Sequence, residues 1–471
     1  MINEKCGVFG TYGVKNAAEI LYLGLFSLQH RGQESAGMVV SDGITVKEYK
    51  EMGLVSEVFH GDILKKLPGH IGLGHVRYST TGSPSTRNIQ PFLGECRFGS
   101  LSIAHNGNLA NTWTLWKQLS RRGAVFQSSM DTELLLHLVA QSRFDSLEDA
   151  VKEALWQMKG AFSLGIMSEK KLIAARDPWG FRPLSLGKLN SGYLVSSESC
   201  AFDVIGAEFL REIEPGEMLV IDENGPRSFF YAHSPRKAMC IFELIYFARP
   251  DSFIFGQSVY EARKKMGRIL AEKETVSADM VIPVPESGIY AALGFSEASG
   301  LPLEFGIIRN PYVGRTFIRP GQENRNLAVK LKLNPVRNLL KGKRIIIMED
   351  SIVRGNTSLQ RIKTLKNAGV KEVHMRVSSP PHCYPCFYGI DFPTREELLA
   401  CRMNQDEIQQ YLGLDSLRYI GIDGLQRSVT LPGNHFCFAC FNGDYPVIPD
   451  QEQGKLILEK RTITVPTLKI P

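Results

Sequence analysis

Apolar and polar positions follow different periods in the two halves of the chain. Up to about residue 222, short apolar or alternating stretches are separated by turns, which is typical of β-strands. The expected strands are 6–11, 35–40, 73–78, 101–105, 162–167, 193–196 and 218–221. Helical spacing occurs at 16–30, 110–121 and 131–141. The pattern predicts a first half in which sheets dominate.

Later in the chain, apolar strands alternate with helices. Residues 223–237 contain Asn-Gly, two prolines and several charges, so we expect a crossing between two units there. Beyond it we expect strands at 279–285, 303–308, 344–348 and 372–378, and helices at 257–269, 290–298 and 357–367. Strands that alternate with helices predict a parallel sheet.

Length and composition fit this division. At roughly 150 residues per domain, 471 residues predict two to four units. A chain with 43% hydrophobic and 22% charged residues is not disordered. Its apolar runs fall short of the roughly 18 residues that a membrane span needs, and its N-terminus has no apolar signal stretch. We expect a soluble, cytoplasmic protein with no membrane partner.

Charge and cysteine content leave several functions open. A net charge of +6 suits anionic small molecules as well as nucleic acid. Nine cysteines without a secretory signal favour thiols, metal ligands or a nucleophile over disulfides.

Cys6, in Lys-Cys-Gly-Val-Phe-Gly, would alone indicate a buried core residue. Two further segments change that reading: Leu-Gln-His-Arg-Gly-Gln-Glu-Ser-Ala-Gly-Met at 28–38, and Gly-His-Val-Arg-Tyr-Ser-Thr-Thr-Gly at 74–82, which is followed by Ala-His-Asn-Gly-Asn-Leu at 104–109. Together with Cys6 they resemble the glutaminase domain of the class II, N-terminal-nucleophile glutamine amidotransferases.

This resemblance implies a mechanism for Cys6. Removal of residues 1–5 would make Cys6 N-terminal, and its α-amine, with a pKa of about 7.7–8, would act as the base. The charge that develops on the amide oxygen would be stabilised by the side-chain amide of Asn106 and the backbone N–H of Gly107.

The same resemblance implies how glutamine binds. Arg77 would pair with the α-carboxylate, and Asp131 would hold the α-ammonium group. Arg31 would belong to a loop that closes over the bound glutamine.

A second group of candidate residues lies within 343–358, where an apolar strand leads into Glu349, Asp350 and a Gly-Asn-Thr-Ser turn that opens a helix. A helix N-terminus attracts phosphate, and two acids at a strand end suit sugar hydroxyls and Mg²⁺. No Walker or Gly-x-Gly-x-x-Gly pattern is present, which disfavours an ATPase and a dinucleotide enzyme.

The 343–358 segment resembles the phosphoribosyl-diphosphate (PRPP) loop of type I phosphoribosyltransferases. Val-Pro-Glu-Ser-Gly at 284–288 resembles the pyrophosphate-side loop of that family. Glu349 and Glu286 stand where the family usually has aspartate. The implied Mg²⁺ ligands are Ser287, Glu349 and Asp350. The implied PRPP contacts are Ser287, Gly288, Arg315, Ser351, Gly355, Asn356, Thr357 and Ser358.

Residues 309–337 contain seven Lys or Arg and the single acid Glu323. Nucleic-acid binding would suit this charge, but no aromatic ladder or helix-turn-helix accompanies it. The segment, which includes Arg315, resembles the flexible loop of glutamine PRPP amidotransferases, and this implies a flap over pyrophosphate rather than a nucleic-acid partner.

Cysteines form a third group, in Cys383-Tyr-Pro-Cys386 and Cys437-Phe-Ala-Cys440. Their spacing alone favours a structural zinc site. Resemblance to the iron–sulfur branch of the PRPP amidotransferases implies instead one [4Fe–4S] cluster, which would leave Cys383 unused. Its ligands would be Cys240, Cys386, Cys437 and Cys440. Four thiolates suit either metal group.

The resemblance covers about residues 6–445 and implies the domain order. A propeptide at 1–5 would precede an α+β N-terminal-nucleophile glutaminase domain, layered αββα, at 6–230. An α/β type I phosphoribosyltransferase domain with a mainly parallel sheet and the cluster ligands would follow at 231–445, and a C-terminal tail at 446–471.

The implied reaction hydrolyses glutamine and passes ammonia to C1 of PRPP, which gives 5-phosphoribosylamine, glutamate and pyrophosphate in purine biosynthesis. A homotetramer inhibited by purine nucleotides is also implied. Two alternatives remain: a diverged paralogue with another ammonia acceptor, and a regulator that senses PRPP or binds nucleic acid.

Overall fold

A computed structural model describes residues 6–78, 85–310, 333–390, 395–450 and 458–459. These residues form two compact units. The first contains the described residues of 6–239, residues 387–390 and the described residues after 445. The second contains the described residues of 240–386 and of 395–445. Thus two segments from the second half of the sequence fold with the first unit.

Two antiparallel sheets form the first unit. One has the order β11 (Glu208–Glu212), β9 (Ser185–Leu189), β10 (Gly192–Ser196), β1 (Gly7–Tyr12), β4 (Ile71–Arg77), β2 (Ser35–Ser41) and β3 (Val46–Met52). The other has the order β13 (Gly225–Phe230), β12 (Glu217–Asp222), β8 (Leu172–Arg176), β7 (Gly160–Met167), β6 (Gly99–Leu109) and β5 (Phe92–Cys96).

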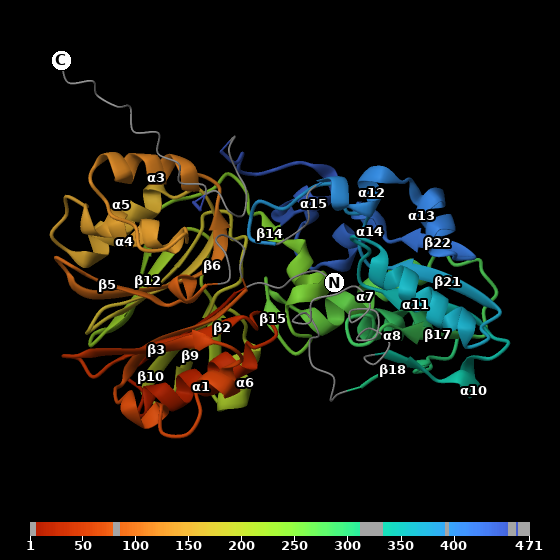
Figure 1. Cartoon of the computed structure of the whole chain (residues 1–471), viewed down its shortest axis with the longest axis horizontal. Coiled ribbons are helices and arrows are strands. Elements are labelled where there is room, and N and C mark those ends of the chain that lie inside the picture. The colour runs from red at the N-terminus through yellow and green to blue at the C-terminus, as the bar shows by residue number, and fades with distance from the viewer. Residues whose placement is uncertain (1–5, 79–84, 311–332, 391–394, 451–457, 460–471) are drawn as a thin grey trace, which may run out of the picture. The chain divides into compact units, whose positions relative to one another are not determined.

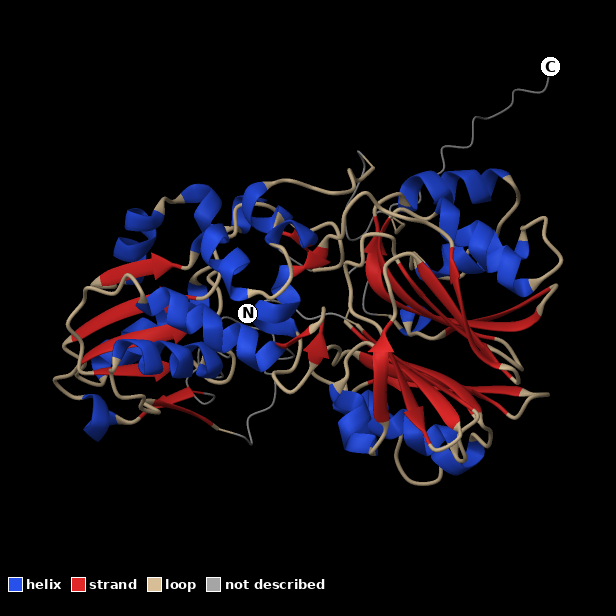
Figure 2. Cartoon of the chain, turned by 180° about the vertical axis from the view of Figure 1, so that it is seen from behind, coloured by secondary structure: helices blue, strands red, loops and turns tan. Residues whose placement is uncertain are grey.

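Helices cover the outer face of each sheet, as Figure 2 shows. The core on the first sheet includes α1 (Ala17–Ser27), α2 (Val55–Val58) and α6 (Cys200–Ile205). The core on the second includes α3 (Thr112–Arg121), α4 (Thr132–Ala140) and α5 (Leu147–Gln157). A third apolar cluster joins the two sheets through residues such as Val8 and Leu172. The predicted αββα layering is confirmed.

The predicted crossing at residues 223–237 is wrong in part. It contains β13 (Gly225–Phe230), which pairs antiparallel with β12. This strand lies at the edge of its sheet and is largely exposed, so it has no buried face that would produce an alternating apolar pattern. Its Pro226 is tolerated because an edge strand leaves one row of N–H groups unpaired.

In the second unit, a parallel sheet has the order β17 (Met280–Pro283), β20 (Arg344–Glu349), β21 (Glu372–Val377) and β22 (Ser416–Tyr419), which confirms the predicted parallel sheet (Figure 1). The expected strand at 303–308 is wrong in part, because the strand there, β18 (Ile307–Arg309), pairs antiparallel with β19 (Leu333–Pro335) outside this sheet. Alternate residues of β20 face opposite sides. Ile345 and Ile347 share a core with α11 (Asn356–Asn367) and α13 (Gln405–Leu412). Ile346 and Met348 pack with α7 (Val259–Ala271) and α8 (Ile289–Ser299).

Shorter elements complete this unit. They are β14 (Met239–Cys240), β15 (Phe253–Ile254), β16 (Gln257–Ser258), β18 (Ile307–Arg309), β19 (Leu333–Pro335), β23 (Phe436–Cys437), α10 (Arg337–Leu340), α12 (Leu399–Arg402), α14 (Gly421–Ser428) and α15 (Ala439–Asn442). Within the described residues, no helix is both long enough and apolar enough to cross a membrane.

Described residues of the C-terminal segment return to the first unit. The N–H of Asp450 donates to the carbonyl of Ala110, and its carboxylate accepts from the N–H of Thr114 at 3.0 Å. Leu458 is buried in the core formed with α3, α4 and α5. The described part of this segment is therefore a component of the first unit.

Candidate active sites

Cys6 lies directly before β1 and is buried. Its Sγ donates a hydrogen bond to the carbonyl of Tyr78 at 3.4 Å. Burial raises the pKa of the Cys6 thiol to about 11, although this hydrogen bond and the charge of Arg77 act in the opposite direction. The thiol is therefore protonated at neutral pH and needs a base before it can act as a nucleophile.

Arg31 fixes the backbone of Cys6. Its Nε donates to the carbonyl of Cys6 at 3.0 Å, and its guanidinium forms a fully buried ion pair with Glu198. His30 contacts the same carboxylate at 2.7 Å. These contacts give Arg31 a role in positioning the nucleophile, while its closing over glutamine stays a prediction. Glu198 was missed because it lies 167 positions after Arg31, beyond any local pattern.

The predicted oxyanion site lies on β6. The side chain of Asn106 is buried, and neither its amide nitrogen nor its amide oxygen has a hydrogen-bond partner within the described structure. A buried polar group without a partner costs about 1–3 kcal/mol, so such a group marks a place where a ligand would supply the missing bond. Beside it, Gly107 has φ +154°, and a Cβ there would lie 2.1 Å from the carbonyl oxygen of Ala161. Only glycine fits at this position.

Asp131 lies immediately before α4 and is buried. Its carboxylate accepts from the N–H of Leu109 at 3.1 Å and faces Nδ1 of His105 at 3.3 Å. The other ring nitrogen of His105 faces the carbonyl of Ala161 at 3.3 Å, so both nitrogens meet acceptors, as an imidazolium requires. Burial alone would raise the pKa of Asp131, but His105 and Arg77 outweigh it and lower that pKa.

Arg77 ends β4 and is also buried. Burial lowers the pKa of Arg77, while the nearby Cys6 and Asp131 act to raise it. The charges of Arg77 and Asp131 in turn both act on the Cys6 thiol. The structure thus brings the predicted nucleophile together with the two groups predicted to bind glutamine.

The second candidate site lies where two parallel strands end. Pro283 of β17 is in register with Met348 of β20, so the loops that follow these strands meet at one edge of the sheet. Ser287 Oγ donates a hydrogen bond to Asp350, which joins two of the predicted Mg²⁺ ligands. Gly355 immediately precedes α11, and residues 356–358 form its first turn.

Glu349 has a partner that the sequence analysis missed. Its carboxylate forms a buried ion pair with Arg361 of α11. Burial raises the pKa of Glu349 to about 8, and the charge of Asp350 adds to this effect while Arg361 opposes it. Arg361 lies one helical turn after Thr357, so the helical period of 356–367 places both on one face. The helical period of the sequence could therefore have placed Arg361 on the same face as Thr357.

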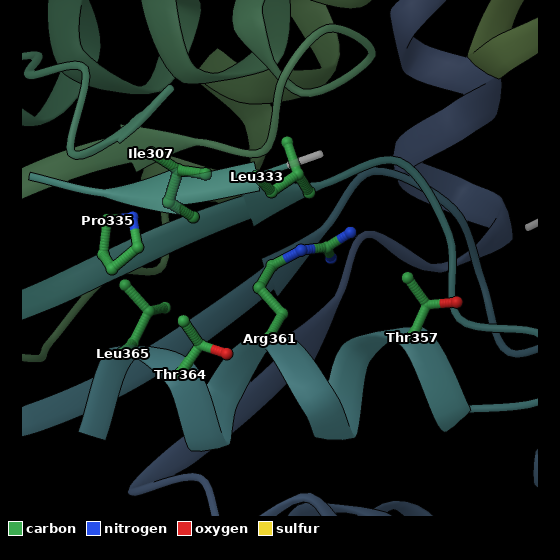
Figure 3. A pocket seen from close by; sticks show the side chains of 7 residues that line it. All are labelled: Ile307, Leu333, Pro335, Thr357, Arg361, Thr364 and Leu365. Atoms are coloured by element: carbon green, nitrogen blue, oxygen red, sulfur yellow. The ribbon is translucent and has the colours of Figure 1, made fainter. Parts of the chain in front are cut away.

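Arg361 also lines a pocket (Figure 3). Its lining comes from the two short strands β18 and β19 and from one face of α11, and consists of Ile307, Leu333, Pro335, Thr357, Arg361, Thr364 and Leu365. Arg315 and residues 311–332 of the predicted flap lie outside the described residues. Glu286 is largely exposed and pairs with Arg309 at 2.9 Å.

Four of the cysteines lie near one another. β14 and β23, which carry Cys240 and Cys437, pair with each other, and Cys440 follows in α15. Burial raises the pKa of Cys440 well above its usual value, and the thiols of Cys386, Cys437 and Cys240 add to this shift. The backbone N–H of Cys383 donates to the carbonyl of Cys440 at 3.2 Å, but its thiol is not among those that act on the Cys440 thiol, and the thiol that acts on it is that of Cys401.

The thiols are not arranged as a preformed ion site. Among the residues that the structure describes, no group of three or more His, Cys, Asp or Glu side chains is placed so that it could hold a metal ion. The chemistry of the donor set nevertheless fits a thiolate-bound metal group, because the thiol of Cys440 interacts with the thiols of the three other predicted ligands.

Known proteins share both halves of this arrangement. The glutamine amidotransferase domain family matches residues 75–204. Amidophosphoribosyltransferase of Bacillus subtilis is 47% identical over 453 residues, which cover 94% of each chain. Amidophosphoribosyltransferase 1, chloroplastic, of Arabidopsis thaliana is 48% identical over 454 residues, which cover 96% of this chain and 80% of that one. The solved structure of glutamine PRPP amidotransferase from B. subtilis with ADP and GMP has a TM-score of 0.90 at 46% identity, and covers 95% of this chain and 99% of its own.

The fold and its two candidate sites define a glutamine amidotransferase domain joined to a phosphoribosyltransferase domain. The identity and coverage are high along nearly the whole chain. The chain belongs to the amidophosphoribosyltransferase family. The family and the fold class predicted from the sequence are confirmed.

Proposed function

We propose that this chain is a glutamine-dependent amidophosphoribosyltransferase of purine biosynthesis. It hydrolyses glutamine and delivers ammonia to C1 of PRPP, with 5-phosphoribosylamine, glutamate and pyrophosphate as products. Family membership supports the overall reaction. The single observation that carries the glutaminase half is the buried, unpartnered amide of Asn106, on the same strand as the N–H that Asp131 binds.

The glutaminase half begins at Cys6. After removal of residues 1–5, the α-amine of Cys6 takes the thiol proton, which the raised thiol pKa otherwise retains at neutral pH. Sulfur attacks the side-chain carbonyl of glutamine, and the oxyanion accepts hydrogen bonds from Asn106 and Gly107. The α-ammonium group of Cys6 returns this proton to the departing nitrogen, so ammonia leaves and a γ-glutamyl thioester remains. Water then releases glutamate and regenerates the thiol.

Two buried charged residues orient the substrate. The α-carboxylate of glutamine pairs with Arg77, and its α-ammonium group meets Asp131. Because His105 and Leu109 already hold Asp131, its carboxylate is fixed before the substrate arrives. Because the Asp131 carboxylate is already ordered, glutamine binding loses less side-chain conformational entropy.

The phosphoribosyl half uses the edge of the parallel sheet. Asp350, Glu349 and Ser287 would hold Mg²⁺, which when bound neutralises charge on the departing pyrophosphate. The hydrogen bond from Ser287 to Asp350 supports this set. The 5′-phosphate would meet the first turn of α11, where unpaired N–H groups and the helix dipole attract anions. Gly288, Arg315, Ser351 and Gly355 stay predicted PRPP contacts.

We also propose one [4Fe–4S] cluster on Cys240, Cys386, Cys437 and Cys440. Support comes from the pairing of β14 with β23 and from the interaction of these four thiols. A zinc ion on the same ligands is the alternative, and metal analysis distinguishes them.

Regulation by purine nucleotides, a homotetramer and a cytoplasmic location belong to the same proposal. The relative from B. subtilis was solved in complex with ADP and GMP, which supports nucleotide binding by this chain. Oligomeric state would be measured by light scattering on anaerobically purified protein.

The decisive experiment is pyrophosphate release by anaerobically purified protein supplied with glutamine, PRPP and Mg²⁺. We expect release that needs all three, with 5-phosphoribosylamine trapped as product. Glutamine hydrolysis without use of PRPP would identify a paralogue with another acceptor. PRPP binding without either reaction would identify a regulator.

A further inference from the structure

Residues 387–390 follow Cys386 in sequence but fold with the glutaminase unit. The carbonyl of Phe387 accepts from Nδ2 of Asn108 at 3.0 Å, and the carbonyl of Tyr388 accepts from the buried Arg182. The ring of Tyr388 stacks on Phe181, with centroids 4.2 Å apart. These contacts hold the segment against β6 and the residues near β8.

The C-terminal segment anchors the same ring. Tyr388 is buried, and its hydroxyl donates to the carbonyl of Val447 at 2.6 Å and accepts from the N–H of Val447 at 2.9 Å. The hydroxyl therefore both donates and accepts a hydrogen bond within the unit. A segment with this many specific contacts has a fixed backbone position.

Gly389 places this backbone directly on Gly107. Gly389 has φ +96°, and a Cβ there would lie 2.9 Å from the carbonyl carbon of Gly107 and 3.0 Å from its oxygen. A Cβ on Gly107 itself would lie 2.1 Å from the carbonyl oxygen of Ala161 of β7. Gly107 is therefore packed against both Ala161 and Gly389, in contacts too close for a side chain on either glycine.

We propose that residues 387–390 are part of the glutaminase site, with Gly389 as a positioning residue that holds Gly107 so that its N–H meets the oxyanion. The inference rests on the proposed function, because it takes Gly107 as an oxyanion donor. Oxyanion donors act on charge that develops in the transition state, and loss of one costs about 10²–10³ in kcat. A displaced Gly107 therefore lowers kcat more than it weakens glutamine binding.

The test compares Gly389→Ala with Gly206→Ala. Gly206, which follows α6 in the same unit, has φ +73° and no atom within 4 Å of the added Cβ, so its variant carries the backbone strain alone. We expect Gly389→Ala to lower kcat for glutamine hydrolysis by about tenfold to a thousandfold, with KM for glutamine within about threefold of Gly206→Ala. Ammonia-dependent synthesis should stay within about twofold, since that reaction bypasses the oxyanion site.

A second variant covers failure of Gly389→Ala to fold. Tyr388→Phe removes both hydrogen bonds to Val447 without adding an atom, and we expect a smaller fall in kcat with the same unchanged KM. The proposal is overturned if the folded variants match the control in kcat, if KM rises while kcat holds, or if ammonia-dependent synthesis falls in parallel. Wild-type protein without glutamine hydrolysis would instead overturn the proposed function itself.

Discussion

At the scale of single residues, the environment of Cys6 determines its reactivity. Burial keeps the thiol protonated, with a pKa of about 11, while residues 1–5 remain attached and block the α-amine. The thiolate is the form that reacts with alkylating agents. Cys6 of the unprocessed chain is therefore expected to react slowly at pH 7.

We expect iodoacetamide to modify Cys6 of the unprocessed chain at a rate that rises about tenfold per pH unit between pH 7 and pH 10. Mass spectrometry of the Cys6 peptide measures this rate apart from the other cysteines, and the partly buried thiol of Cys96 in the same digest is the internal reference. A rate that already levels off near pH 8 would contradict the raised pKa.

The acid pair at the end of β20 is asymmetric, because Glu349 is paired with Arg361 whereas Asp350 accepts from Ser287. We expect Asp350→Asn to lower glutamine-dependent and ammonia-dependent synthesis alike, by about tenfold to a thousandfold. Glu349→Asp, which keeps a carboxyl group at this position, should retain activity. Steady-state rates with each nitrogen source check both variants.

The control for Asp350→Asn is Asp251→Asn, which makes the same change at a largely exposed ion pair with Arg249. This control should leave both rates unchanged. Equal PRPP-dependent rates in Asp350→Asn and the control would remove Asp350 from the site.

At the scale of elements, one buried ion pair ties the loop after α7 to β21. Glu274 binds Arg376 through Nε at 2.6 Å and Nη2 at 2.9 Å, and both side chains are almost fully buried. Burial alone would raise the pKa of Glu274, but Arg376 lowers it to about 2. A lowered folded-state pKa contributes stability above the unfolded value, near 4.5, and that stability is lost as pH falls towards 2.

We expect Glu274→Gln to lower the free energy of unfolding by about 3 kcal/mol at pH 7, because it leaves the Arg376 charge buried without a counter-ion. The deficit should shrink as pH falls from 4.5 towards 2. Urea unfolding across this range measures it, with the exposed pair variant Glu297→Gln as control. A deficit that is constant with pH would exclude the ionised pair as its source.

Elements with two buried faces or a helical apolar period could be predicted from the sequence, and the parallel sheet of β17, β20 and β21 is the main example. The edge strand β13 could not, since its exposed residues carry no period. Nor could the return of residues 387–390 to the first unit, because their contacts with Asn108 and Arg182 span 279 and 206 positions. Glu198 was missed for the same reason, whereas Asn106, Asp131 and Arg77 lie in recognisable motifs.

At the scale of the whole molecule, the cysteine ligands come from three separate stretches of chain, so a cluster would fasten the fold of the second unit. Anaerobic protein should be brown, with about four irons and four sulfides per chain. Cys386→Ala should lose this content, while Cys383→Ala, three positions away, should keep it. Colourless protein with one zinc, or the reverse pattern in the two variants, would contradict the ligand set.

The two half-reactions use different units, so they should separate by mutation. Ammonia from solution enters the phosphoribosyl reaction without glutamine hydrolysis. The hydrogen bond of Asp350 with Ser287 and the ion pair of Glu349 with Arg361 do not include Cys6. We expect Cys6→Ala to abolish glutamine-dependent synthesis and to retain ammonia-dependent synthesis at high pH, where NH₃ is abundant. Cys96→Ala, at a partly buried thiol at the end of β5 in the same unit, is the matched control and should keep both activities. Loss of both activities in a folded Cys6→Ala protein that still binds PRPP would show that Cys6 serves more than glutamine hydrolysis.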